Sequence, residues 1–150
     1  PGARVFNSDR LRKRMFGAEP TARLPAEAYR SEVSANVYAG LFESAAQVAT
    51  LGWPVIVDAV FDRPQDRASI EDAATQAAAP FFGAWLDVSL EQRLARVDKR
   101  VGDVSDATRD VLLLQMEKET GEIGWRRLDA AEAEAAAKNI LADLPSSRRA

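Results

Sequence analysis

The 150-residue chain contains no cysteine and no histidine. Without cysteine there are no disulfides, thiolate nucleophiles or thiolate metal sites. Without histidine there is no imidazole to act as a general base or a metal ligand, so acid–base chemistry must use carboxylates. The chain also lacks an apolar run of about 18 residues and a signal-peptide pattern. We therefore expect a cytoplasmic protein that does not enter a membrane.

The bulk composition is that of an ordinary globular domain. Hydrophobic residues make up 47% of the chain and charged residues 29%, which argues against disorder. The formal net charge of −3 gives no electrostatic reason to expect a nucleic-acid partner. We find no internal repeat and no dividing linker, so we expect one domain over residues 1–150 with a frayed tail at 145–150.

Patterns typical of strands and helices alternate along the chain. Apolar residues recur at helical spacing from about residue 27 to 51, and Gly52 and Pro54 end this helix. Val55–Phe61 is almost continuously apolar and β-branched, which is typical of a strand buried on both faces. Other strands are expected at residues 4–9, 81–87 and 125–129, and other helices at 11–16, 64–78, 89–100, 106–119 and 131–144. This alternation predicts an α/β fold with a mostly parallel sheet.

One carboxylate, Asp58, lies within the apolar run Val55–Phe61. A buried carboxylate is unfavourable unless it is paired or bound to a cation. Parallel α/β sheets bind ligands beyond the carboxyl ends of their strands, where Asp58 would hold Mg²⁺ directly or through water. The alternative is a carboxylate that caps or bonds a neighbouring loop.

Asp9 and Arg12 form an Asp-x-x-Arg pattern after the first predicted strand. One helical turn separates them, so the carboxylate and the guanidinium can face one ligand. The carboxylate would accept a hydroxyl proton, and the guanidinium would bind a phosphate or carboxylate in bidentate fashion. The alternative is a helix cap followed by solvated basic residues.

A third set of candidates is basic. Arg93, Arg96 and Arg100 step by three and four residues and share one helical face. They lead into residues 101–106, which contain glycine and which we interpret as a lid loop over phosphates. The alternative is an ordinary solvated surface.

Taken together, four segments resemble the P-loop small-molecule kinases of the AAA-type ATP-binding family, whose relatives include gluconate kinase, polynucleotide kinase, chloramphenicol phosphotransferase and zeta toxins. The segments are Asn7–Lys13, Val55–Phe61, residues 96–115 and Leu128–Ala130. The resemblance implies a P-loop NTPase-like parallel sheet flanked by helices. It also implies ATP- and Mg²⁺-dependent phosphoryl transfer to a hydroxyl of a small molecule, chemistry that depends on positioning and charge neutralisation.

The resemblance also implies roles for single residues. Asp9 resembles the carboxylate that orients or deprotonates the acceptor hydroxyl, and Arg12 the residue that binds the substrate or the transferring phosphoryl group. Asp58 resembles a Walker-B-type acid that acts on Mg²⁺. The remaining candidates resemble binding arginines, namely a substrate-side Arg67 and the lid arginines Arg96 and Arg100, which would contact the nucleotide phosphates.

The chain departs from the family in one respect, because Gly-x-x-x-x-Gly-Lys-Ser/Thr does not occur in it. In the family the backbone amides of this loop hold the phosphates, its lysine neutralises them, and its hydroxyl binds Mg²⁺. The match begins at the family's second strand. We therefore expect a strand, this loop and a helix, roughly 30–40 residues, to precede Pro1, and the chain alone to be inactive.

The same departure predicts a gap in the sheet. In the family's strand order, the missing strand separates the strand of Asp58 from the strand at 81–87. Each backbone group left unpaired on these two edges would cost about 1–3 kcal/mol if buried. We expect the chain alone to be poorly stable or to repack its sheet, unless an upstream domain or self-association covers the edges.

Two other functions stay open at this point. A non-catalytic module with the same scaffold would bind a protein partner and would explain the absent loop. A nucleic-acid-end kinase is suggested by Asp-x-x-Arg, but the acidic balance of the chain argues against it. The sequence does not identify the phosphate acceptor, which we expect residues 17–37 to select.

Overall fold

The computed structural model describes residues 2–99 and 103–144. The elements are β1 (Arg4–Asn7), α1 (Ser8–Met15), the 3-10 helix η1 (Ala26–Tyr29), α2 (Ser31–Thr50), β2 (Val55–Asp58), α3 (Pro64–Gln76), β3 (Ala84–Asp87), α4 (Leu90–Asp98), α5 (Arg109–Met116), β4 (Arg126–Asp129) and α6 (Ala133–Asp143). The predicted α/β class is confirmed. Within the described ranges, no helix is long and apolar enough to cross a membrane. Arg100, the start of the predicted lid loop and the predicted frayed tail fall outside them.

The strands form two separate parallel pairs, β1 with β2 and β3 with β4. The register of the first pair runs from Arg4 opposite Val55 to Asn7 opposite Asp58. In the part of the chain that the structure describes, no strand pairs with the second edge of β2 or of β3. This agrees with the predicted gap between these two strands, while the poor stability of the chain alone stays a prediction.

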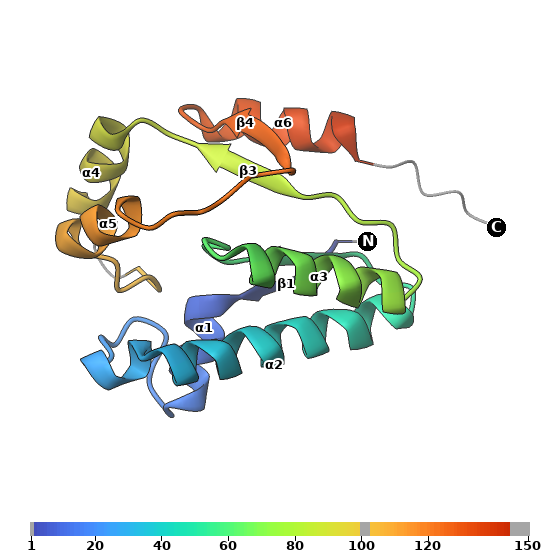
Figure 1. The fold of residues 1–150 in the computed structure, drawn as a ribbon, viewed down its shortest axis with the longest axis horizontal. Coiled ribbons are helices and arrows are strands. Elements are labelled where there is room, and N and C mark those ends of the chain that lie inside the picture. Colours follow the sequence, from blue (N-terminus) through green and yellow to red (C-terminus); the bar gives the residue numbers. More distant parts are fainter. Residues whose placement is uncertain (1, 100–102, 145–150) are drawn as a thin grey trace.

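Helices α2 and α3 pack against each other on one side of the β1–β2 pair, and β3, β4 and α6 lie on the other side of α3 in the view of Figure 1. Tyr38, Ala45, Phe61 and Ile70 form a buried cluster between these parts. The rings are arranged edge to face, with centroids 5.8 Å apart for Tyr38 and Phe61 and 5.0 Å apart for Phe61 and Trp125. Trp125 immediately precedes β4, so this aromatic cluster joins the two strand pairs.

Strand β2 is shorter and less covered than its sequence predicts. Strand β2 ends at Asp58, and it cannot extend through Phe61, whose positive φ of 51° lies outside the β region. The Phe61 N–H donates to the Tyr38 hydroxyl at 3.2 Å, and the turn places the Phe61 ring in the core. Ile56, on the face of β2 opposite to Val55 and Val57, is 52% exposed. The prediction of a strand to Phe61 with both faces buried is therefore wrong.

Arg67 also ties the two strand pairs together. Its side chain is buried and its guanidinium lies 5.8 Å from the ring centroid of Trp85 in β3. The nitrogens Nη1 and Nη2 donate to four backbone carbonyls, those of Phe61 (2.7 Å), Asp62 (3.3 Å), Thr120 (2.6 Å) and Glu122 (3.1 Å). A side chain of α3 thus holds the end of the β2 segment against the segment that leads into β4.

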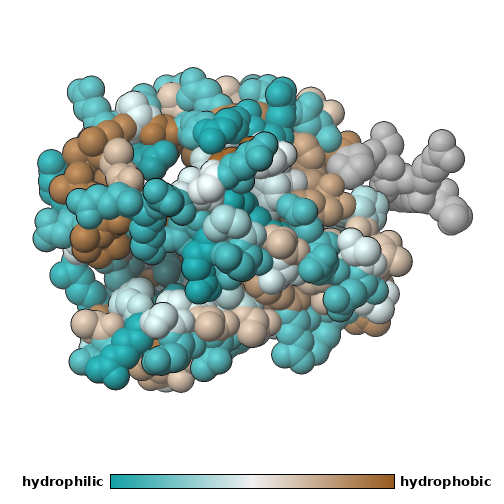
Figure 2. Space-filling view, in the orientation of Figure 1, coloured by the Kyte–Doolittle hydropathy of each residue, from teal (hydrophilic) through white to brown (hydrophobic). Residues whose placement is uncertain are grey.

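Helix α5 exposes apolar side chains on its outer side. Leu114 is 61% exposed, and Val111, Leu113 and Met116 are exposed as well. Figure 2 shows apolar side chains gathered over α4 and α5 at the left of the view. Only Leu112 of this helix is buried, so α5 packs through one narrow side against the rest of the described chain.

Gly83→Ala is expected to destabilise the fold. A Cβ at this position would overlap the Trp125 ring, which also packs against the rings of Phe61 and Phe81. Overpacking of this kind costs about 1–3 kcal/mol. Gly124→Ala is the control, because a Cβ there meets nothing within 4 Å. Urea unfolding of both variants checks the prediction, and equal midpoints would contradict it.

Candidate functional site

Asp9 and Asp58 lie at the same edge of the β1–β2 pair. Strand β1 ends at Asn7, and Asp9 is in the first turn of α1, while Asp58 is the last residue of β2. Because the strands are parallel, both acids come at the carboxyl edge, where α/β sheets bind ligands. Asn7 Nδ2 donates to Asp58 Oδ2 at 2.7 Å, and Asn7 Oδ1 accepts from the Arg10 N–H at 2.9 Å. Asn7, which the sequence patterns did not single out, thus caps α1 and links it to Asp58.

The Asp58 side chain faces solvent at this edge. A single hard carboxylate oxygen suits Mg²⁺, which takes one or two carboxylates and completes its shell with phosphate oxygens and water. Residues 2–99 and 103–144 contain no group of three or more acidic side chains that could hold a metal by themselves. Asp58 would therefore hold the ion only together with a bound nucleotide and water.

Asp9 is partly shielded from solvent by the segment that precedes α5. Its carboxylate accepts a hydrogen bond from the Ser105 side chain. Burial raises the pKa of Asp9, and this outweighs the hydrogen bond from Ser105 and the charge of Arg12, which lower it. A carboxylate with a raised pKa is a better proton acceptor for a hydroxyl group.

Arg12 is almost fully buried, with 6% of its surface exposed. Its Nη1 donates to the Ala28 carbonyl at 2.6 Å and to Ser34 Oγ at 3.3 Å, and its guanidinium lies 4.9 Å from the Tyr29 ring centroid. Its Nε is buried and has no hydrogen-bond partner among the described residues. A buried donor without a partner is unfavourable, and an oxygen of a bound ligand would satisfy it.

The buried Lys13 forms an ion pair with the partly buried Asp106 next to Arg12. Lys13 is 1% exposed, and its Nζ lies 3.0 Å from Asp106 Oδ1 and donates to the Pro20 carbonyl at 2.9 Å. Asp106 Oδ2 accepts from the Tyr29 hydroxyl at 2.5 Å and from the Leu24 N–H at 2.9 Å. Burial by itself would raise the pKa of Asp106, but these donors together lower it. Burial and the bond to Asp106 raise the pKa of Tyr29.

The helix that the sequence predicts from residue 106 begins later, at Arg109, and Asp106 does not cap it. Thr108 caps α5, because its side chain accepts from the Val111 N–H at 3.4 Å and α5 begins at Arg109. Asp106 instead joins α1, η1 and residue 24 through its carboxylate. Its partners are distant in sequence, so no local pattern could have identified them.

Asp9 and Asp106 should affect stability in opposite pH ranges. The Asp9 pKa is raised in the fold, so its favourable contribution is complete below 3.8 and is lost as pH rises through the folded value. The Asp106 pKa is lowered, so its contribution is present above 3.8 and is lost as pH falls through the folded value. We expect Asp9→Asn to raise the thermal unfolding midpoint at neutral pH and Asp106→Asn to lower it. If both variants shifted the unfolding midpoint in the same direction, the opposite pKa shifts of Asp9 and Asp106 would be contradicted.

The structure places two of the other predicted arginines, Arg67 and Arg96, in backbone contacts. Arg67 binds the four carbonyls described above, and its substrate-side role stays a prediction. Arg96 Nη2 donates to the carbonyls of Ala130 at 2.6 Å and Ala131 at 2.7 Å, directly after β4. Arg96 thus holds α4 against the end of the second strand pair, and its role at nucleotide phosphates likewise stays a prediction.

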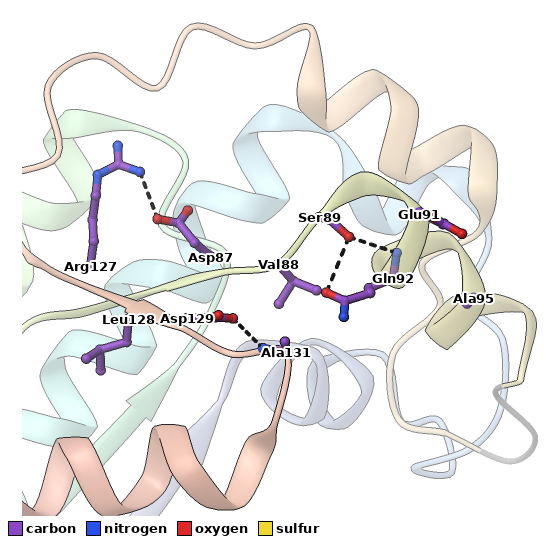
Figure 3. Close-up of a pocket in the computed structure, with 10 residues that line it drawn as sticks. All are labelled: Asp87, Val88, Ser89, Glu91, Gln92, Ala95, Arg127, Leu128, Asp129 and Ala131. Atoms are coloured by element: carbon purple, nitrogen blue, oxygen red, sulfur yellow. Dashed lines mark hydrogen bonds and ion pairs between the residues drawn. The ribbon is translucent and has the colours of Figure 1, made fainter.

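A hollow of about 950 Å³ lies at the carboxyl ends of β3 and β4. Figure 3 shows Asp87 pointing toward Arg127, with which it forms an ion pair at 3.0 Å. On the other side of the hollow the Ala131 N–H donates to Asp129 Oδ1 at 2.8 Å. Both strand pairs therefore present polar side chains at their carboxyl ends, the edge at which a ligand of this sheet would bind.

A comparison with protein-family models matches residues 1–120 to a family described as an AAA domain. The matched span runs from β1 through α5 and includes Asp9, Arg12, Asp58 and the Lys13–Asp106 pair. Neither the curated proteins nor the solved structures compared with the chain gave a match.

Proposed function

Because the chain belongs to this family of AAA domains, which are nucleotide-binding domains of the P-loop NTPase type, we propose that it forms part of an ATP-dependent small-molecule kinase. The observation that carries the proposal is that Asp58 ends β2 and Asp9 follows β1 at the same carboxyl edge of this parallel pair, where Asn7 binds Asp58 and caps the helix that carries Asp9. Phosphoryl transfer can use two carboxylates at this edge, because one can accept the proton of the acceptor hydroxyl and the other can bind a cation.

In this proposal Asp9 orients the acceptor hydroxyl and takes its proton. The acceptor oxygen forms a bond to the γ-phosphorus of ATP, the bond from that phosphorus to the leaving oxygen breaks, and ADP departs with the electron pair. Arg12 offers its Nε, which has no partner within residues 2–99 and 103–144, to an oxygen of the acceptor or of the transferring group. Asp58 would hold Mg²⁺, which when bound neutralises charge on the phosphate oxygens.

Radiolabelled ATP with Mg²⁺ and a panel of sugars, sugar acids, nucleosides and amino alcohols tests the proposal. The sequence contains no Gly-x-x-x-x-Gly-Lys-Ser/Thr string, so the assay uses both residues 1–150 and the polypeptide extended by the coding sequence immediately upstream. We expect the extended polypeptide to transfer the γ-phosphate to one acceptor class. Asp58→Asn should lower this rate about 100-fold or more.

Asp98→Asn is the matched control, because Asp98 pairs with Arg109 on the surface and lies outside the proposed site. Its rate should equal that of the wild type. Unchanged transfer by Asp58→Asn would remove Asp58 from the site. A stop codon directly upstream, together with no transfer to any acceptor, would contradict the kinase proposal. The remaining hypothesis would then be a non-catalytic module that binds a protein partner.

A further inference from the structure

Ser105 and Asp106 place a hydroxyl and a carboxylate, the two functional groups of a small hydroxy acid, next to Asp9 and Lys13. The Ser105 side chain hydrogen-bonds Asp9, the proposed base. The Asp106 carboxylate binds Lys13 Nζ, the Tyr29 hydroxyl and the Leu24 N–H, three donors that we call the anion cradle. The chain thus places a hydroxyl on the base and a carboxylate in the cradle, on adjacent residues.

The anion cradle requires an anion. Lys13 is 1% exposed, and its only other described contact within hydrogen-bond distance is one backbone carbonyl. A buried ammonium is strongly unfavourable without an opposite charge. The three donors come from α1, from η1 and from residue 24, and none belongs to the segment that carries Asp106. A carboxylate from a bound molecule could therefore use the same donors.

Arg12 independently indicates a missing ligand atom. Its Nε is a buried donor that neither Ser105 nor Asp106 satisfies. Arg12 is close enough to Asp9 to lower its pKa, and its guanidinium stacks on Tyr29 of the cradle. A ligand with one more oxygen than the Ser105–Asp106 pair offers would complete this set of donors.

We infer that the acceptor is a small hydroxy acid whose hydroxyl replaces Ser105 on Asp9 and whose carboxylate replaces Asp106 in the anion cradle; this inference rests on the proposed function. In the transfer, the hydroxyl oxygen bonds to the γ-phosphorus, the bond to the leaving oxygen of ADP breaks, and the hydroxyl proton passes to Asp9. Asp106 competes for the cradle as a tethered group, with an effective concentration on the order of millimolar. The free hydroxy acid consequently binds the wild type weakly.

Calorimetric titration with glycerate, glycerol and acetate, in the absence of nucleotide, tests the inference. Asp106→Ala empties the cradle, so it should bind glycerate at least about tenfold more tightly than the wild type does. Glycerol lacks the carboxylate and acetate lacks the hydroxyl. Both should therefore bind Asp106→Ala at least about tenfold more weakly than glycerate does. Adding Lys13→Met to Asp106→Ala should abolish glycerate binding. A folded Asp106→Ala that binds all three compounds equally, or none, overturns the inference.

Carboxyl modification by a carbodiimide keeps the test decisive if Asp106→Ala does not fold. In the wild type, glycerate should increase the modification of Asp106 while Asp9 stays protected, because the ligand displaces one carboxylate and covers the other. Unchanged reactivity of Asp106 at saturating glycerate contradicts the inference. Glycerate binding without phosphoryl transfer would refute the kinase alone, and transfer to neutral acceptors without glycerate binding would refute the hydroxy acid alone.

Discussion

Asp9→Asn is expected to lower kcat for phosphoryl transfer by about 10²–10⁴-fold, the usual contribution of a positioned general base. Asparagine has nearly the same shape and can still accept the hydrogen bond that Ser105 donates in the wild type, but it cannot take a proton. The fold and the acceptor contacts through Arg12 should survive. The loss should therefore appear in kcat, with KM little changed.

The pH profile separates this role from a structural one. Burial raises the pKa of Asp9, and the base form is the ionised one, so kcat/KM of the wild type should rise with pH through that pKa. The residual activity of Asp9→Asn should lack this rise. Wild-type activity in Asp9→Asn at neutral pH would contradict the assignment, and Asp98→Asn again serves as the surface control.

Arg67→Met is expected to lower the free energy of unfolding by about 3–5 kcal/mol, as when one partner of a buried charged interaction is removed. Methionine fills much of the same volume but leaves four backbone carbonyls without their donor. These carbonyls come from the end of the β2 segment and from the segment before β4. Because no strand described here bridges β2 and β3, the loss should separate the two halves of the fold.

Arg126→Met is the matched control for this prediction. Arg126 is also paired, with Asp143 at 3.1 Å, but its side chain is 62% exposed. An exposed pair contributes about 0–1 kcal/mol. Urea unfolding followed by circular dichroism compares the variants. Equal urea midpoints for Arg67→Met and Arg126→Met would show that the hydrogen bonds of Arg67 do not stabilise the contact between the two segments.

The elements of the fold were predictable because their signals are local. The helical spacing before Gly52 predicts α2, and Pro64 marks the first turn of α3. The end of β2 was not predictable, since Phe61 turns into a core made with Tyr38 from a different helix. A continuous apolar run cannot reveal where tertiary packing interrupts it.

The candidate site was predictable only in part. Parallel topology predicts that Asp9 and Asp58 share an edge, and their positions at the ends of β1 and β2 agree with this. The link through Asn7 depends on strand register. Asp106 stands close to a helix start, so it resembled a cap, although its bond to the Leu24 N–H spans 82 residues. The hydrogen bonds of Arg67 that the structure describes go to backbone carbonyls, and backbone acceptors leave no trace in a sequence pattern.

Broadening of amide resonances by Mn²⁺·ATP tests most directly whether Asp9 and Asp58 face one phosphate-binding site. The experiment uses ¹⁵N-labelled protein, as residues 1–150 and as the extended polypeptide, with Mg²⁺·ATP as the diamagnetic reference. In the extended polypeptide, Asp9 and Asp58 should both broaden strongly while α6 residues keep sharp signals. Broadening of only one of the two acids, or of neither while other signals are lost, would contradict a shared site.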